Sequence, residues 1–227
     1  SLYVYAASNE TAEEHSARTN RQTINIALYV ASLLLVSGII LLAQTVGLDN
    51  TLKFVLVWLM IAVYYVAGLV LYQRVPLVKP AAVAFIGTAL AGVPVAGIVM
   101  YTLVSHNAAL CWLATSLLGA VLYSYATVKI KSQSLAYISL LSFFIFLCSL
   151  PAVAHAQLMW YYVVMIAFGS VLTILAQYKF AWVPRAFAQP VATSSPIIVP
   201  LALMASFVSF PFMKAGEYTA VFAAATV

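Results

Sequence analysis

The sequence predicts an all-α membrane protein, a polytopic bundle of transmembrane helices with seven full spans and a truncated eighth. Two observations lead to this prediction. First, 65% of the 227 residues are hydrophobic and only 7% are charged, whereas soluble domains average about 25% charged residues. Second, the apolar runs are continuous, without the alternation expected of barrel strands. Because backbone polar groups must be paired inside hydrocarbon, such runs form helices.

Seven apolar runs are each long enough to cross a hydrocarbon core about 30 Å thick. They are Ile24–Gln44, Leu52–Tyr72, Ala81–Val104, Ala108–Val128, Leu135–Val153, Leu158–Tyr178 and Ile197–Met213. An eighth run starts at Tyr218 and stops after ten residues, which is too short to span a membrane. We therefore expect the chain to be a fragment of a longer protein.

A repeat of about 50 residues organises the chain. Gly68-Leu69-Val70-Leu71-Tyr72 returns as Gly119-Ala120-Val121-Leu122-Tyr123, and more loosely as Gly169-Ser170-Val171-Leu172. Each period holds two apolar runs, which is typical of a repeated helical hairpin. We expect a polar segment at 1–23 and a transmembrane domain at 24–227, with hairpins at 24–74, 75–131, 132–195 and, truncated, 196–227.

The cations predict the orientation of the spans. The N-terminal tail and the even-numbered loops carry eight of the ten: Arg18, Arg21, Arg74, Lys79, Lys129, Lys131, Lys179 and Arg185. The odd-numbered loops hold only Lys53 and Lys214. By the positive-inside rule, the N-terminus is cytoplasmic and the odd-numbered loops face outward.

The sixth loop, Lys179 to Ser195, is longer than the others. Its Trp182, Arg185 and Phe187 indicate a segment that lies at the inner membrane interface, where amphipathic rings settle.

Three prolines fall toward the outer ends of odd-numbered spans: Pro94, Pro151 and Pro211. A proline inside a helix removes a backbone hydrogen bond, so we expect a kink at each position. The kinks either shape a cavity that opens outward or only fit one helix against another, because prolines are common in membrane helices.

No ionisable residue lies at mid-membrane, which argues against proton-relay pumps and against enzymes that use paired carboxylates. The polar residues at depth are hydroxyls: Ser32, Ser37, Thr88, Ser116, Ser142, Ser170, Thr173 and Ser206. Hydroxyls of this kind bond to their own backbone or across a helix contact, so we expect them to serve packing.

Two cysteines and two histidines lie toward the outer ends of neighbouring spans. His106 and Cys111 are at the start of the fourth span, and Cys148 and His155 are at the end of the fifth. This set could bind zinc or copper, the cysteines alone could form a disulfide, or all four are inert. No spacing matches a metal motif, and no haem-attachment motif is present. We therefore expect neither a metal site nor a cofactor.

Two stretches resemble uncharacterised bacterial multi-pass membrane proteins, which are known only as domains of unknown function. They are Tyr29-Val30-Ala31-Ser32-Leu33-Leu34-Leu35-Val36-Ser37-Gly38-Ile39-Ile40 and the region from Ala84-Phe85-Ile86-Gly87-Thr88 through Pro94-Val95-Ala96-Gly97. The resemblance covers about the first 100 residues. It implies a protein of the bacterial cytoplasmic membrane and carries over no functional residue.

The sequence favours a non-enzymatic scaffold or a component of an envelope complex, which contacts the lipid bilayer and other membrane proteins. The alternative is a transporter or binding protein for a lipid-like or small apolar molecule, held between helices by shape and hydroxyls. The cations form no basic stripe, so nucleic acid is not an expected partner.

Overall fold

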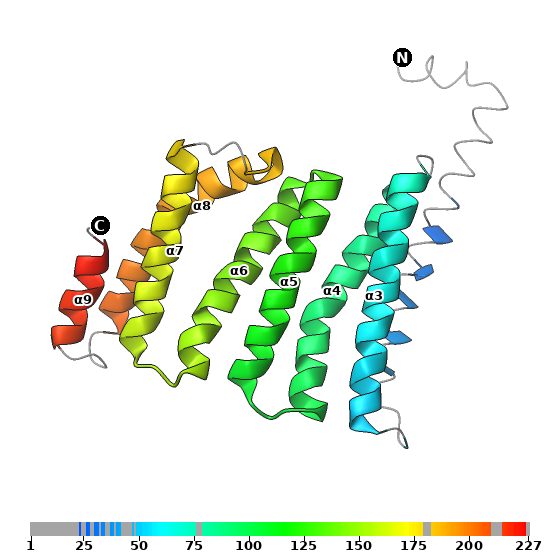
Figure 1. Ribbon diagram of the computed structural model, residues 1–227, viewed down its shortest axis with the longest axis horizontal. Coiled ribbons are helices and arrows are strands. Elements are labelled where there is room, and N and C mark those ends of the chain that lie inside the picture. The colour runs from blue at the N-terminus through cyan, green and yellow to red at the C-terminus, as the bar shows by residue number, and fades with distance from the viewer. Residues whose placement is uncertain are drawn as a thin grey trace, which may run out of the picture. The chain divides into compact units, whose positions relative to one another are not determined.

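The computed structural model describes residues 49–75, 79–178, 183–209 and 215–225, with isolated positions between 23 and 47. Its regular elements, shown in Figure 1, are α3 (Asn50–Arg74), α4 (Lys79–Leu103), α5 (Ala108–Ile130), α6 (Gln133–Val153), α7 (Leu158–Tyr178), α8 (Arg185–Val208) and α9 (Ala215–Ala225). Among the described residues there is no strand, and α3 to α8 give six helices long and apolar enough to cross a membrane. The predicted all-α class is confirmed. The chain is a multi-pass integral membrane protein.

Five of the predicted spans coincide with α3 to α7, to within a few residues at each end. The first predicted span, Ile24–Gln44, falls mostly outside the described residues, although the isolated positions described from 23 to 41 are helical. The truncated eighth run corresponds to α9, which begins at Ala215 rather than at Tyr218. With eleven residues, α9 is too short to span the hydrocarbon core.

Local capping explains where two of these helices begin. The carboxylate of Asp49 accepts a hydrogen bond from the backbone N–H of Thr51 at 3.0 Å, and α3 begins at the next residue after Asp49. The side chain of Asn107 accepts from the N–H of Leu110 at 3.2 Å at the start of α5. Each side-chain oxygen thus satisfies a backbone donor that has no partner inside the helix.

The chain divides into two compact units, residues 1–92 and 93–227, and α4 passes from one into the other. In the first unit α3 packs against the first half of α4. The rings of Tyr64 and Phe85 stack with centroids 5.2 Å apart, and the Lys79 ammonium lies 5.7 Å from the centre of the Tyr72 ring. This cation–π contact lies where the two helices meet their connecting loop.

In the second unit, α5 packs along α6 and α7 packs along α8, and α9 contacts α7 and α8. The hydroxyls of Ser124 and Ser139 lie 2.5 Å apart across the α5–α6 contact. The Tyr162 hydroxyl of α7 bonds to Ser209, directly after α8. These polar contacts hold neighbouring helices together where lipid supplies no hydrophobic driving force.

The three repeated glycines share a structural position, because each faces the helix that follows it in the chain. A Cβ on Gly68 would lie 2.7 Å from the Ile86 side chain of α4, and one on Gly169 would lie 2.6 Å from Val199 of α8. At Gly119 the contact is looser, 3.6 Å from the hydroxyl of Ser142 on α6. The repeated sequence therefore lies at the contacts of three helix pairs, α3–α4, α5–α6 and α7–α8. The hairpin boundaries stay a prediction.

The prediction of a loop from Lys179 to Ser195 is wrong over most of this range, because residues from Arg185 onward are helical. Helix α8 begins at Arg185, twelve residues before the predicted span at Ile197, and it contains Pro190, Pro196 and Pro200. In Figure 1 its first turns run crosswise to α6 and α7, the direction expected of an interfacial segment, and the remainder follows α7. Trp182 lies outside the described residues.

One hydroxyl of α8 compensates for Pro196, and another bonds to the helix backbone nearby. Thr193 donates to the carbonyl of Gln189 at 2.9 Å. Ser195 lies 3.5 Å from the carbonyl of Ala192, the acceptor that Pro196 leaves without its backbone donor. Such side-chain donors keep a proline-containing helix intact in a membrane.

The structure describes two of the three prolines that we expected to cause kinks. Pro94 lies inside α4 and Pro151 lies in the last turn of α6, so both helices continue through them. Pro211 lies outside the described residues. The kinks themselves stay predictions.

Candidate functional site

The four Cys and His residues singled out from the sequence do not form a cluster. Among the described residues, no group of three or more His, Cys, Asp or Glu side chains gathers as a metal would require. Cys111 is buried and its thiol donates to the carbonyl of Ser105 at 3.4 Å, while Cys148 is half-buried. Both cysteines are free, so the structure contains no disulfide between them. His106 sets its ring edge-on to Tyr101, and His155 occupies a left-handed backbone position, with φ of 49°.

Most of the hydroxyls at depth have the packing role expected of them. Ser37, Thr88, Ser116, Thr173 and Ser206 each donate to a carbonyl three or four residues earlier in their own helix. A hydroxyl whose proton is used in this way offers a ligand no donor, which fits the packing role.

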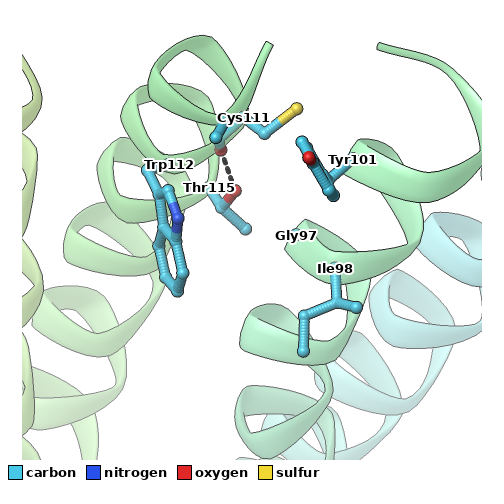
Figure 2. Close-up of a pocket in the computed structure, with 7 residues that line it drawn as sticks. Gly97, Ile98, Tyr101, Cys111, Trp112 and Thr115 are labelled. Atoms are coloured by element: carbon cyan, nitrogen blue, oxygen red, sulfur yellow. Dashed lines mark hydrogen bonds between the residues drawn. The ribbon is translucent and has the colours of Figure 1, made fainter. Parts of the chain in front are cut away.

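A cavity of about 140 Å³ lies beside Cys111, between α4 and α5. Figure 2 shows Trp112 and Thr115 of α5 facing Ile98 and Tyr101 of α4. The Thr115 hydroxyl donates to the carbonyl of Cys111, drawn as the dashed line, so its proton is not available to a ligand. A dry cavity of about 150 Å³ holds one benzene-sized molecule. This cavity is therefore too small for a lipid, and two of its polar side chains, Cys111 and Thr115, donate to backbone carbonyls.

A second cavity, of about 160 Å³, lies between α4, α5 and α6. Pro94, Gly119 and Ser142 line it, so it adjoins both a predicted kink and a repeated glycine. Its lining is otherwise mainly apolar, and its size is close to that of the first cavity.

A larger space is a groove of about 310 Å³ formed by α6, α7 and α8. Its lining residues are Tyr137, Leu140, Leu141, Phe144, Met165, Phe168, Leu172, Ser194, Ile197, Ile198 and Leu201. The floor is α7, where Phe168 is 5% exposed and Leu172 is 2% exposed. The rims are α6 and α8, where Leu141 and Ile197 are 56% and 61% exposed. We call this site the α6–α8 groove. It opens between its rims toward the surroundings of the bundle.

The α6–α8 groove is elongated along the helices. On each of its three helices the lining residues span eight positions, from Tyr137 to Phe144, from Met165 to Leu172 and from Ser194 to Leu201. At 1.5 Å per residue, this corresponds to a length of about 10 Å. Such a shape suits a segment of extended hydrocarbon chain better than a compact molecule.

One end of the groove is polar and the other is apolar. Tyr137 and Ser194 lie at the end where α6 begins, whereas Phe144, Met165 and Leu201 lie two turns away. At the polar end the hydroxyls of Tyr137 and Thr193 are 2.7 Å apart, which joins α6 to α8. This hydrogen bond bridges two walls of the groove at its polar end. All eleven lining residues are uncharged.

The packing around the floor fixes its shape. Phe168, Leu172 and Val191 form a buried cluster, against which Leu140, Phe144 and Phe187 pack. The ring centroids of Phe144 and Phe168 lie 5.6 Å apart at a tilt of 37°. Phe187 belongs to the part of α8 that the sequence assigned to a loop, so this cluster depends on the early start of that helix.

Comparison of the chain with protein-family models, curated proteins and solved structures gives no match. The α6–α8 groove is therefore the feature from which we infer function. Sequence reasoning missed the groove because its α8 wall includes Ser194, which was assigned to a loop. A signal was present, since Thr193 and Ser194 lie between Pro190 and Pro196, and proline-rich membrane helices depend on such hydroxyls.

Proposed function

We propose that the chain is a non-enzymatic membrane protein that binds a lipid-like apolar molecule in the α6–α8 groove. The observation that carries the proposal is the combination of a buried floor at Phe168 and Leu172 with exposed rims at Leu141 and Ile197. A ligand pocket is typically concave and mostly apolar, with a few polar groups that fix the orientation of the ligand. In a bilayer, a groove of this form accepts an acyl chain from the side.

The sequence favoured a scaffold, and this remains the second candidate. What supports it is the use of the hydroxyls at depth in backbone hydrogen bonds, together with the close helix contacts at Gly68 and Gly169. Both features favour a rigid bundle. The groove favours binding instead, because close packing of α6, α7 and α8 alone would leave no elongated space between them.

The location in a bacterial cytoplasmic membrane, with a cytoplasmic N-terminus, is also part of the proposal. The distribution of cations supports the orientation, and the resemblance of Tyr29–Ile40 to uncharacterised bacterial membrane proteins supports the location. In this orientation the polar end of the groove faces the cytoplasmic side, because Lys131 lies two residues before α6.

A cavity-filling substitution tests the proposed function. Leu140 lines the groove and is partly buried against its floor, so Leu140→Trp should occupy the space of the ligand. Val171→Trp is the matched control, because Val171 is an exposed residue of α7 outside the groove lining. We expect binding of an apolar fluorescent probe, measured in detergent micelles, to fall at least about tenfold in Leu140→Trp alone, a loss of about 1.4 kcal/mol.

Both variants are first compared by thermal unfolding, because overpacking a core position costs about 1–3 kcal/mol. Equal probe binding by two folded variants, or equal loss in both, would refute the groove as the binding site.

A further inference from the structure

The polar end of the groove presents a hydrogen-bond acceptor to a ligand. The Thr193 hydroxyl has a single proton, and the carbonyls of Gln189 and Pro190 lie 2.9 and 3.2 Å from its oxygen. With that proton directed at the α8 backbone, the 2.7 Å contact with Tyr137 requires Tyr137 to be the donor. The phenolic proton is then used, and the remaining lone-pair capacity of Tyr137 Oη can only accept.

Ser194 adds a second polar group at the same end. It lines the groove, it is half-buried, and its hydroxyl has no hydrogen-bond partner among the described residues. A serine hydroxyl can both donate and accept. A ligand hydroxyl that donates to Tyr137 and exchanges a hydrogen bond with Ser194 therefore matches both groups.

The charge of the site argues against an anionic head group. None of the residues that line the groove is charged, and phosphate or carboxylate is normally held by charge-assisted donors. The nearest cations in sequence are Lys131, six residues before Tyr137, Lys179, seven residues after Leu172, and Arg185, nine residues before Ser194. None of these three cations is among the residues that line the groove.

We infer that the ligand is a neutral single-chain lipid whose head group is a hydroxyl, such as a long-chain alcohol or a monoacylglycerol. Its hydrocarbon chain lies along the α7 floor toward Phe144 and Met165, and its hydroxyl donates to Tyr137 Oη beside Ser194. The inference rests on the proposed function and specifies the chemical class and the orientation of the ligand.

Three photoreactive probes with the same diazirine-bearing hydrocarbon chain test the inference. One ends in an alcohol, one in the methyl ether of that alcohol and one in its phosphate monoester. The purified full chain in micelles is labelled at increasing probe concentration, and the sites are mapped by peptide mass spectrometry. We expect saturable labelling of α6 and α8 by the alcohol, with an affinity about fivefold higher than that of the ether, a difference of about 1 kcal/mol. The phosphate should bind no better than the ether.

Two variants separate the acceptor role of Tyr137 Oη from its hydrogen bond with Thr193. Tyr137→Phe removes Oη and should lower the affinity of the alcohol to that of the ether. Thr193→Val breaks the same 2.7 Å contact but keeps Oη, so it should retain the preference for the alcohol. If both variants unfold at the same temperature and lose the preference for the alcohol over the ether equally, the role of Tyr137 is overturned.

The outcomes distinguish the inference from the proposed function. Saturable labelling of the groove with equal affinity for alcohol and ether, or with the phosphate preferred, overturns the hydroxyl head group and leaves the binding function standing. Labelling that does not saturate, or that lies outside α6, α7 and α8, shows annular lipid only and overturns both.

Discussion

Gly169→Ala should destabilise the contact between α7 and α8. A Cβ at this position would lie 2.6 Å from Val199 Cγ2 and 3.2 Å from Ile198 Cγ2, closer than side chains pack. Both neighbours are β-branched, so their χ1 angles have little freedom to move away. Overpacking of this kind costs about 1–3 kcal/mol, against a gain of about 1 kcal/mol from replacing glycine by alanine in a helix.

Gly119→Ala is the control, because this glycine holds the equivalent place in the repeat. A Cβ there would meet Tyr123 at 3.5 Å and Ser142 at 3.6 Å, both ordinary contacts. The helix-propensity gain is common to both substitutions and cancels in their difference. The unfolding free energy of Gly169→Ala should therefore be lower than that of Gly119→Ala by about 2 kcal/mol.

Thermal unfolding in detergent measures this difference. Cys111 is buried, so in a Cys148→Ser background a thiol-reactive dye reports its exposure when the bundle opens. A difference of about 2 kcal/mol corresponds to a Tm difference of about 6 °C for a chain of this size. Equal Tm values for the two alanine variants would refute the close α7–α8 contact.

Two further predictions concern orientation and the cysteines. In a Cys-free background, Asn107→Cys should react with an impermeant thiol reagent in intact cells and Ser132→Cys should not, because the positive-inside rule places them on opposite faces; the reverse pattern would invert the orientation. Replacing both Cys111 and Cys148 by Ser should lower stability only within the usual range of about 0.5–3 kcal/mol. Stoichiometric zinc or copper in the purified protein, lost in that double variant, would contradict this.

The sequence predicted the helices whose signals are local. The spans of α3 to α7 follow from continuous apolarity, and Asp49 and Asn107 cap α3 and α5 by side-chain hydrogen bonds within three residues. The start of α8 could not be predicted in this way. Pro190, Pro196 and the hydroxyls between them are typical of a loop. In the structure, Phe187 and Val191 pack with α7, and the Thr193 and Ser195 hydroxyls bond to the helix backbone.

The groove was beyond sequence reasoning for a related reason. Its volume depends on the packing of Leu140, Phe168 and Ile198, which lie on three different helices. A continuous apolar run does not indicate which of its residues face a neighbouring helix. The contact between Tyr137 and Thr193 joins residues 56 positions apart. The sequence of the repeat also does not reveal that Gly169 approaches α8 more closely than Gly119 approaches α6.

Mass spectrometry of what the protein retains during purification is the most direct test of ligand binding in the groove. The full chain, Leu140→Trp and Val171→Trp are purified in parallel from membranes, and the bound lipids are extracted and quantified per chain. We predict that one neutral hydroxyl-bearing lipid is enriched in the full chain and in Val171→Trp, and is lost from Leu140→Trp. The same lipids in the same amounts from all three proteins would contradict ligand binding in the α6–α8 groove.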